Sequence, residues 1–168
     1  MKFTLETSIN KPIEDVWKIW AVEFDKAQDW IATVPKSHKI DEGELVDGAP
    51  MPGRICQLSN KENGLYADER ITLFDEKNHK MNILVVPKNG NLPVVQNHLK
   101  SSLKEVGENK TVITLETDIQ LKLAGKLLYP VVKPALVKGF TELTEELKHY
   151  AETGQPHPRK VAKMNKNK

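Results

Sequence analysis

The chain begins with an alternation of two kinds of position. Phe3, Leu5, Thr7 and Ile9 alternate with the polar residues Thr4, Glu6, Ser8 and Asn10, the period of a strand with one buried face. Similar short runs return after residue 36, separated by turn signals such as Asn63-Gly64 and Asn89-Gly90. They predict six strands, over about 36–44, 53–60, 65–75, 79–87, 94–106 and 110–121. Successive hairpins of this kind form an antiparallel meander.

Two short helices are expected between the first strand and the meander. Asn10 is the predicted N-cap of the first helix, and Pro12 lies near its first helical position. This helix is predicted to end at about residue 22. The second runs through residues 24–31 and ends before Pro35, because the residue that precedes a proline disfavours the helical conformation.

One long helix is predicted near the C-terminus. Its apolar stripe recurs at spacings of three and four and consists of Leu128, Val132, Leu136, Phe140, Leu143 and Leu147. Glu142, Glu145 and Glu146 are placed on the remaining, solvent-facing surface. Pro130 and Pro134 predict a separate first segment or a kink, with a regular helix from about 134 to 152.

The order of these elements predicts an α+β domain over residues 1–154. In this helix-grip arrangement, a curved antiparallel sheet of about seven strands closes around the long C-terminal helix, and the two short helices follow the first strand. Residues 155–168 carry many basic and few apolar residues, so they are predicted to form a disordered tail. A cavity between helix and sheet is the expected ligand site.

Composition narrows the possibilities further. The chain is 39% hydrophobic and 29% charged and has a net charge of +2, typical of a globular protein. Without the five basic residues after Glu152, 20 basic residues face 23 acidic ones, so nucleic acid is not an expected partner. No apolar run is long enough to span a bilayer, and the N-terminus does not resemble a signal peptide. We therefore expect a cytoplasmic protein without stable membrane insertion; its oligomeric state stays open.

Three segments carry a resemblance to a known family. They are residues 8–17, with the Val16-Trp17 pair, residues 69–75, which begin Glu69-Arg70, and residues 143–152. Their order and spacing resemble the START-like, Bet v 1-type (SRPBCC) superfamily, and within it the polyketide cyclase/dehydrase and lipid-transport type, which is widespread in bacteria. The resemblance covers residues 3–154 and implies a deep apolar cavity that binds lipids, polyketides or other hydrophobic compounds.

The resemblance also implies that Glu69 points into the cavity. Ile71 and Leu73 then face inward too, in agreement with the apolar alternation. For strand 110–121 the two arguments disagree, because the resemblance turns Glu116 inward whereas alternation turns Ile113 and Leu115 inward. We follow the alternation there, since a slip of one residue reverses every side chain.

The candidate site combines polar and apolar residues. Glu69 is the candidate catalytic residue, and Arg54 is its candidate ion-pair partner or a ligand anchor; an ion pair at the rim is the alternative for Arg54. Asn97 needs a hydrogen-bond partner if it is buried. The candidate ligand-binding residues are Trp17, Trp30, Arg54, Glu69, Ile71, Leu73, Met81, Ile83, Asn97, Leu99, Leu128, Val132, Leu136 and Phe140. At least two of the three tryptophans, which include Trp20, are expected to serve core packing.

Metal and cofactor motifs are not apparent in the sequence. The five histidines lack a recognised metal spacing, Cys56 is the single cysteine, and no nucleotide-binding fingerprint occurs. No metal or cofactor is therefore expected. The first hypothesis is a non-catalytic binding or transport protein for a hydrophobic small molecule. The alternatives are a cyclase or dehydratase that uses Glu69, and an interaction module of the co-chaperone type, which predicts a large exposed apolar patch.

Overall fold

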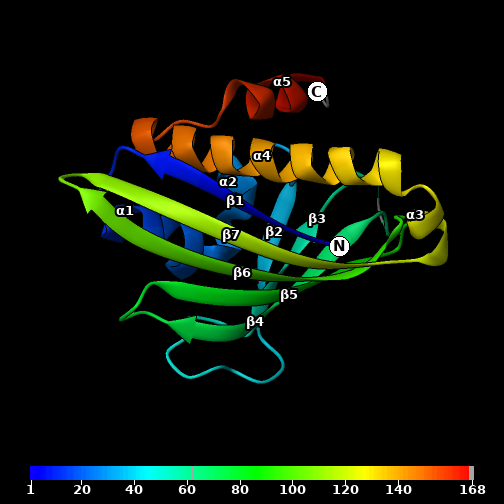
Figure 1. The fold of residues 1–168 in the computed structure, drawn as a ribbon, viewed down its shortest axis with the longest axis horizontal. Helices are drawn as coiled ribbons and strands as arrows, with labels where there is room; N and C mark the ends of the chain where they lie inside the picture. The colour runs from blue at the N-terminus through cyan, green and yellow to red at the C-terminus, as the bar shows by residue number, and fades with distance from the viewer. Residues whose placement is uncertain (62, 167–168) are drawn as a thin grey trace.

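The computed structural model describes residues 1–61 and 63–166. Its seven strands form one antiparallel sheet in the order β1-β7-β6-β5-β4-β3-β2, and one long helix lies across it (Figure 1). The strands are β1 Lys2–Ile9, β2 Lys36–Ile40, β3 Gly53–Gln57, β4 Tyr66–Asp75, β5 Lys80–Lys88, β6 Val94–Gly107 and β7 Lys110–Leu121. The predicted seven-stranded helix-grip fold is confirmed.

Hairpins join the strands from β3 to β7, as the turn signals predicted, whereas a longer loop over residues 41–52 joins β2 to β3. Asn63, Asn89 and Asn109 adopt positive φ values of 55°, 53° and 53°, a conformation that asparagine tolerates better than most residues. β1 closes the order by pairing with β7, with Phe3 opposite Thr117 and Ile9 opposite Thr111. The first and last strands of the chain are therefore neighbours.

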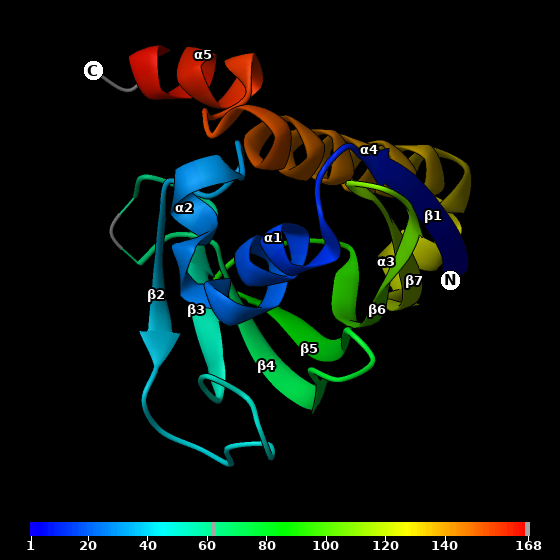
Figure 2. The ribbon, with the colours of Figure 1, turned by 90° about the vertical axis from the view of Figure 1, so that its left-hand side faces the viewer.

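The sheet curves into a trough that helices close on two sides (Figure 2). α4 covers its open top, while the short helices after β1 fill one end. They are α1 Ile13–Trp17, the π-helical turn η1 Lys18–Val22, the 3₁₀ turn η2 Phe24–Lys26 and α2 Ala27–Trp30. The predicted N-cap was wrong: Pro12 occupies that position, and the Asn10 backbone N–H donates to Glu152 instead, at 2.7 Å.

The C-terminal helix begins earlier than predicted. A short helix α3, Leu123–Leu127, precedes α4, which runs without interruption over Tyr129–Thr153. Pro130 lies at the helix start, where its missing N–H costs nothing, and Pro134 lies inside the first turns. The separate first segment is therefore present, but it ends before the prolines. Gly154, at φ 69°, ends α4 in the left-handed conformation that glycine adopts without strain.

Burial along most of the strands follows the apolar alternation. In β7, Ile113, Leu115 and Ile119 are buried and Glu116 is exposed, so alternation gave the correct face. In β4 the prediction for Leu73 was wrong, because its side chain is exposed. A register shift between Ile71 and Leu73 explains the error, since an irregularity of this kind reverses the side chains beyond it.

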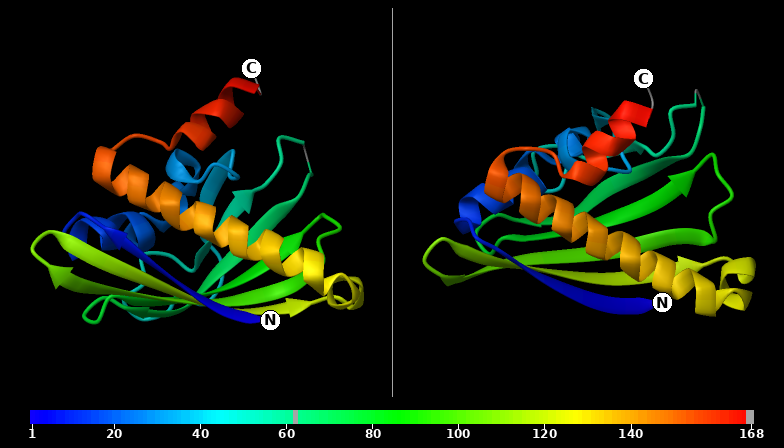
Figure 3. Two further views of the ribbon diagram at one scale, coloured as in Figure 1. Left: turned by 45° about the horizontal axis from the view of Figure 1, so that its top comes forward. Right: turned by 90° about the horizontal axis from the view of Figure 1, so that it is seen from above.

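The predicted disordered tail was also wrong over the described residues. Pro158–Lys166 form a helix, α5, which lies beside the C-terminal half of α4 and close to α2 (Figure 3). Lys160 is buried, and its ammonium donates to the carbonyls of Ile31 (3.1 Å) and Val34 (2.6 Å). Polar contacts of this kind leave no trace in a hydrophobic pattern, which is why the prediction failed.

Leu147 supplies a test of how α4 holds the domain together. Its side chain is fully buried in the main core, so Leu147→Ala is expected to lower the free energy of unfolding by about 2–5 kcal/mol. The same truncation at Leu45, which is 57% exposed, is expected to change it by less than about 0.5 kcal/mol. Urea unfolding of both variants measures the difference; equal effects would show that α4 does not depend on this contact.

Candidate functional site

A cavity of about 350 Å³ lies between α4 and the concave face of the sheet. Its apolar lining comes from Trp20, Ile31, Val34, Leu58, Ala67, Ile83, Val85, Leu99, Ala135, Leu136, Phe140 and Leu143, with Gly139 at the border. Its polar lining comes from Thr33, Arg54, Glu69, Asn97, Glu142 and Glu146. Mostly apolar walls with a few placed polar groups are typical of small-molecule sites.

Arg54 and Glu69 form an ion pair inside this cavity. They stand opposite each other on β3 and β4, and Nε of Arg54 lies 2.7 Å from Oε2 of Glu69, with side chains only 7% and 12% exposed. Arg54 also donates through Nη1 to the Phe24 carbonyl and stacks 3.8 Å over the Phe24 ring. The guanidinium is thus held by a carboxylate, a carbonyl and an aromatic face, and Glu69 is already committed to a partner.

Asn97 lines the cavity and carries a buried amide oxygen without a hydrogen-bond partner in the described part of the chain. The residue is buried on β6, and its Oδ1 has no hydrogen-bond partner among the described residues. The nearby tryptophan is satisfied, because Trp20 Nε1 donates to Ser101 Oγ at 2.8 Å. Buried acceptors are rarely left unpaired in folded proteins, so Asn97 marks a position where a bound molecule with an N–H or O–H can donate.

Cys56 lies behind the ion pair and is not suited to chemistry. It is fully buried on β3, next to the cavity wall. Burial raises the pKa of its thiol to about 12, and the nearby Glu69 carboxylate adds to the effect. The thiolate is the reactive form of cysteine, so Cys56 acts as a small apolar core residue.

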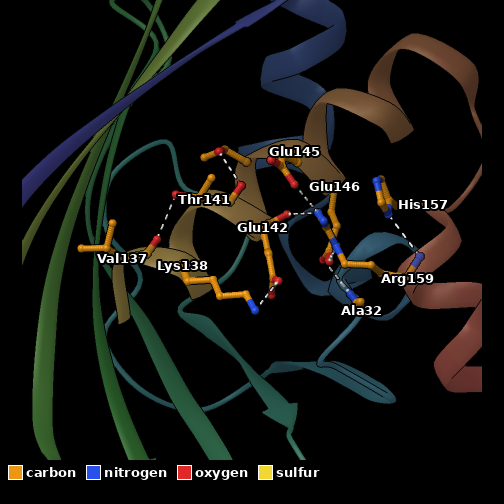
Figure 4. Close-up of polar contacts among 10 residues, drawn as sticks. Ala32, Val137, Lys138, Thr141, Glu142, Glu145, Glu146, His157 and Arg159 are labelled. Carbon is orange, nitrogen blue, oxygen red and sulfur yellow. Dashed lines mark hydrogen bonds and ion pairs between the residues drawn. The ribbon is translucent and has the colours of Figure 1, made fainter. Parts of the chain in front are cut away.

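Glu146 is held in place by the C-terminal helix α5. Instead of facing solvent as predicted, Glu146 is buried; its Oε2 accepts from the Ala32 backbone N–H at 2.8 Å and its Oε1 accepts from Arg159 Nε at 3.0 Å (Figure 4). Arg159 also donates to Glu145 Oε2 at 2.7 Å. The α5 helix therefore neutralises a carboxylate on the cavity wall and ties the 31–34 loop to α4.

The predicted site residues divide into two groups. Arg54, Glu69, Ile83, Asn97, Leu99, Leu136 and Phe140 line the cavity. Trp17, Trp30, Ile71 and Met81 are buried in the core, Val132 packs in a second cluster with Ile119 and Leu121, and Leu73 and Leu128 are exposed. For Trp17 the reason is packing against Phe74 and His79, with ring centroids 5.2 and 5.4 Å away.

Several lining residues were absent from the sequence prediction. Ile31, Thr33 and Val34 belong to a loop that only the fold brings to the cavity. Ala135 and Gly139 also went unnoticed, although their spacing of four places two small residues on one helix face. A search for small residues beside the apolar stripe would have found this pair.

Comparison with known proteins agrees with this geometry. The sequence model of the family described as polyketide cyclase/dehydrase and lipid transport matches residues 1–152. The chain belongs to this family. The match ends near the close of α4, so helix α5 lies beyond the part that the family model describes.

Solved structures with the same fold are distant in sequence. A START superfamily protein from Mycobacterium smegmatis has a TM-score of 0.70 and 12% identity, over 90% of this chain and 97% of that protein. An uncharacterized protein from Bacillus thuringiensis has a TM-score of 0.65 and 18% identity, over 90% and 98%. Norcoclaurine synthase from Thalictrum flavum, solved with a transition-state analogue, has a TM-score of 0.62 and 14% identity, over 90% and 93%. These similarities establish the fold of the family member described here.

Across residues 1–61 and 63–166, no group of three or more His, Cys, Asp and Glu side chains is arranged to hold a metal ion. The polar groups of the lining are the Arg54–Glu69 ion pair, Asn97, Thr33, Glu142 and Glu146.

The Arg54–Glu69 pair is expected to show strong coupling in a double-mutant cycle. Arg54→Leu or Glu69→Leu alone leaves one unpaired charge in a part of the cavity lining that is largely shielded from solvent. Each single change is expected to lower the free energy of unfolding by about 3 kcal/mol. The double variant removes both charges and is expected to lie within about 1–2 kcal/mol of the wild type. Urea unfolding of the four proteins gives the coupling; additive single effects would mean that solvent screens the pair.

Proposed function

We propose that this protein binds or carries an uncharged hydrophobic small molecule in the cavity under α4. The observation that carries the proposal is charge compensation within an apolar pocket. Glu69 pairs with Arg54, and Glu146 pairs with Arg159, so neither buried carboxylate needs a cation from the ligand. The free Oδ1 of Asn97 supplies one acceptor for a ligand that carries an N–H or O–H.

The size of the cavity limits the ligand. A volume of about 350 Å³ lies at the lower end of the range for ligand pockets, roughly 300–1,000 Å³. One compact ring system or a short lipid tail fits this description better than a full phospholipid. The family's description, which includes lipid transport, supports an apolar ligand.

A reaction catalysed in the cavity is the second candidate. The family name includes cyclases and dehydrases, and Glu69 is a carboxylate in the cavity lining. Because Glu69 is engaged in an ion pair with Arg54, it is poorly suited to exchange protons with a ligand. The pair is better suited to orient a ligand carbonyl, which would accept a hydrogen bond from the Arg54 guanidinium. We therefore place binding before catalysis.

Gly139 offers a direct test of the cavity. A Cβ at this position meets no atom within 4 Å, so Gly139→Phe should fill or cover the cavity without displacing the fold. Binding of N-phenyl-1-naphthylamine, an uncharged fluorescent probe, is expected to weaken at least about tenfold, equivalent to about 1.4 kcal/mol.

Gly139→Ala is the matched control for this experiment. It is expected to keep probe binding and to stabilise α4 by about 0.5–1 kcal/mol, because alanine has the higher helix propensity. Native mass spectrometry of the wild type purified from its source should also show an apolar adduct that the phenylalanine variant lacks. Equal probe affinity in all three proteins would contradict binding in this cavity.

Asn97→Leu tests the polar anchor separately. Removing a buried unpaired acceptor is expected to stabilise the empty protein by about 1 kcal/mol, measured by thermal unfolding. The same change should weaken binding of N-phenyl-1-naphthylamine, which carries an N–H, by about fivefold and leave binding of 1-phenylnaphthalene, which has none, unchanged or tighter. Equal loss for both probes would mean that Asn97 shapes the cavity and does not bind the ligand's donor.

A further inference from the structure

The turn between α3 and α4 carries the largest concentration of exposed apolar side chains in the described chain. We call Leu123, Leu127, Leu128, Tyr129 and Val131 the α3 surface; their exposed fractions run from 40% for Tyr129 to 77% for Leu127. Five such residues fall within nine consecutive positions, whereas the other exposed large apolar residues are spread along the chain. A local concentration of exposed apolar side chains is typical of an interaction site.

The charge around the α3 surface has one sign. Residues 119–137 include Lys122, Lys126 and Lys133 and no Asp or Glu, and all three lysines are exposed. Lys133 Nζ lies 5.9 Å from the centre of the Tyr129 ring, within the patch itself. The neighbouring carboxylate, Asp118, is 3.2 Å from Lys2, so it does not offset this positive rim.

The position of the α3 surface suits contact with a flat partner. α3 lies at one extreme of the long axis and protrudes beyond the sheet, as Figures 1 and 3 agree. It is anchored, because the Lys122 N–H donates to the Pro93 carbonyl at 2.9 Å. Gly125 permits this approach, since a Cβ there would lie 2.6 Å from the Pro93 oxygen.

The α3 surface also lies close to the cavity along the same helix. From Tyr129 to Ala135, the first cavity-lining residue of α4, the helix rises about 9 Å. A surface that receives the α3 turn is therefore close to the small side chains that border the cavity.

We propose that the α3 surface docks reversibly on an anionic lipid membrane. Apolar side chains within a lysine rim match the acyl boundary and the phosphate headgroups of such a surface. A second copy fits less well, because a two-fold contact would set the lysines of one rim against those of the other. No helix among the described residues is long and apolar enough to cross a membrane, so the contact is peripheral. The docking does not depend on the proposed cavity ligand.

Co-sedimentation with vesicles tests the docking. The wild type is expected to bind vesicles of equal parts phosphatidylcholine and phosphatidylglycerol and to dissociate from them as the NaCl concentration rises. It is expected not to bind vesicles of phosphatidylcholine alone. Leu123→Ser/Leu127→Ser and Lys126→Glu/Lys133→Glu are each expected to weaken binding at least about tenfold. All four side chains are exposed, and thermal unfolding checks that each variant folds.

Two control variants distinguish binding through the α3 surface from non-specific hydrophobic or electrostatic binding to vesicles. Leu45→Ser removes an exposed leucine in the loop between β2 and β3, and Lys104→Glu/Lys163→Glu reverses two exposed lysines on β6 and α5; both should keep vesicle binding. Absence of wild-type binding, or equal losses in control and test variants, overturns the proposal. A wild-type dimer that Leu123→Ser/Leu127→Ser converts to a monomer overturns it too, because a second copy then covers the surface.

Binding of N-phenyl-1-naphthylamine separates this proposal from the proposed function. The Leu123→Ser/Leu127→Ser variant is expected to bind the probe like the wild type while it loses the vesicles. Vesicle binding without probe binding in the wild type would leave the docking standing and contradict the cavity ligand.

Discussion

The packing of α4 against the concave face of one curved sheet is the constraint on which the rest of the structure depends. Near its C-terminal end, Leu147 and Ala151 are buried in the core, and the contact is tight. Nearer its N-terminal end, Ala135 and Gly139 border the cavity with almost no side chain. Because an apolar stripe fills space only where its side chains are large, the same helix completes the core at one end and leaves a cavity at the other.

The cavity is also shaped by how its charges are balanced. A buried carboxylate is stable only when a partner offsets its loss of hydration, and each of the two buried carboxylates has one. Arg54 comes from the neighbouring strand of the sheet, whereas Arg159 comes from α5, beyond the part of the chain that the family model covers. The C-terminal helix therefore contributes to the chemistry of the cavity wall, and its contact with the 31–34 loop gives that wall its shape.

The fold followed closely from the sequence because its signals are local. The period of two along β6 and β7, the asparagines at the hairpins and the stripe around Leu136 and Phe140 depend on neighbouring residues alone. The site followed in part. Glu69, Asn97 and Leu99 were placed in the cavity by strand alternation and family resemblance, but the register shift after Ile71 turned Leu73 outward, and no local pattern announces such a shift.

The sequence by itself determined the order of strands and helices, the inward face of most strands and the apolar character of the α4 stripe. Only the tertiary structure decided that Trp17 and Met81 fill the core, that Ile31 and Val34 reach the cavity, and that Glu146 is buried beneath Arg159. The physical reason is the distance along the chain between the residues that interact. Periodicity reports contacts within one element, whereas a cavity, a buried ion pair and a docked basic helix each depend on residues that lie far apart along the chain.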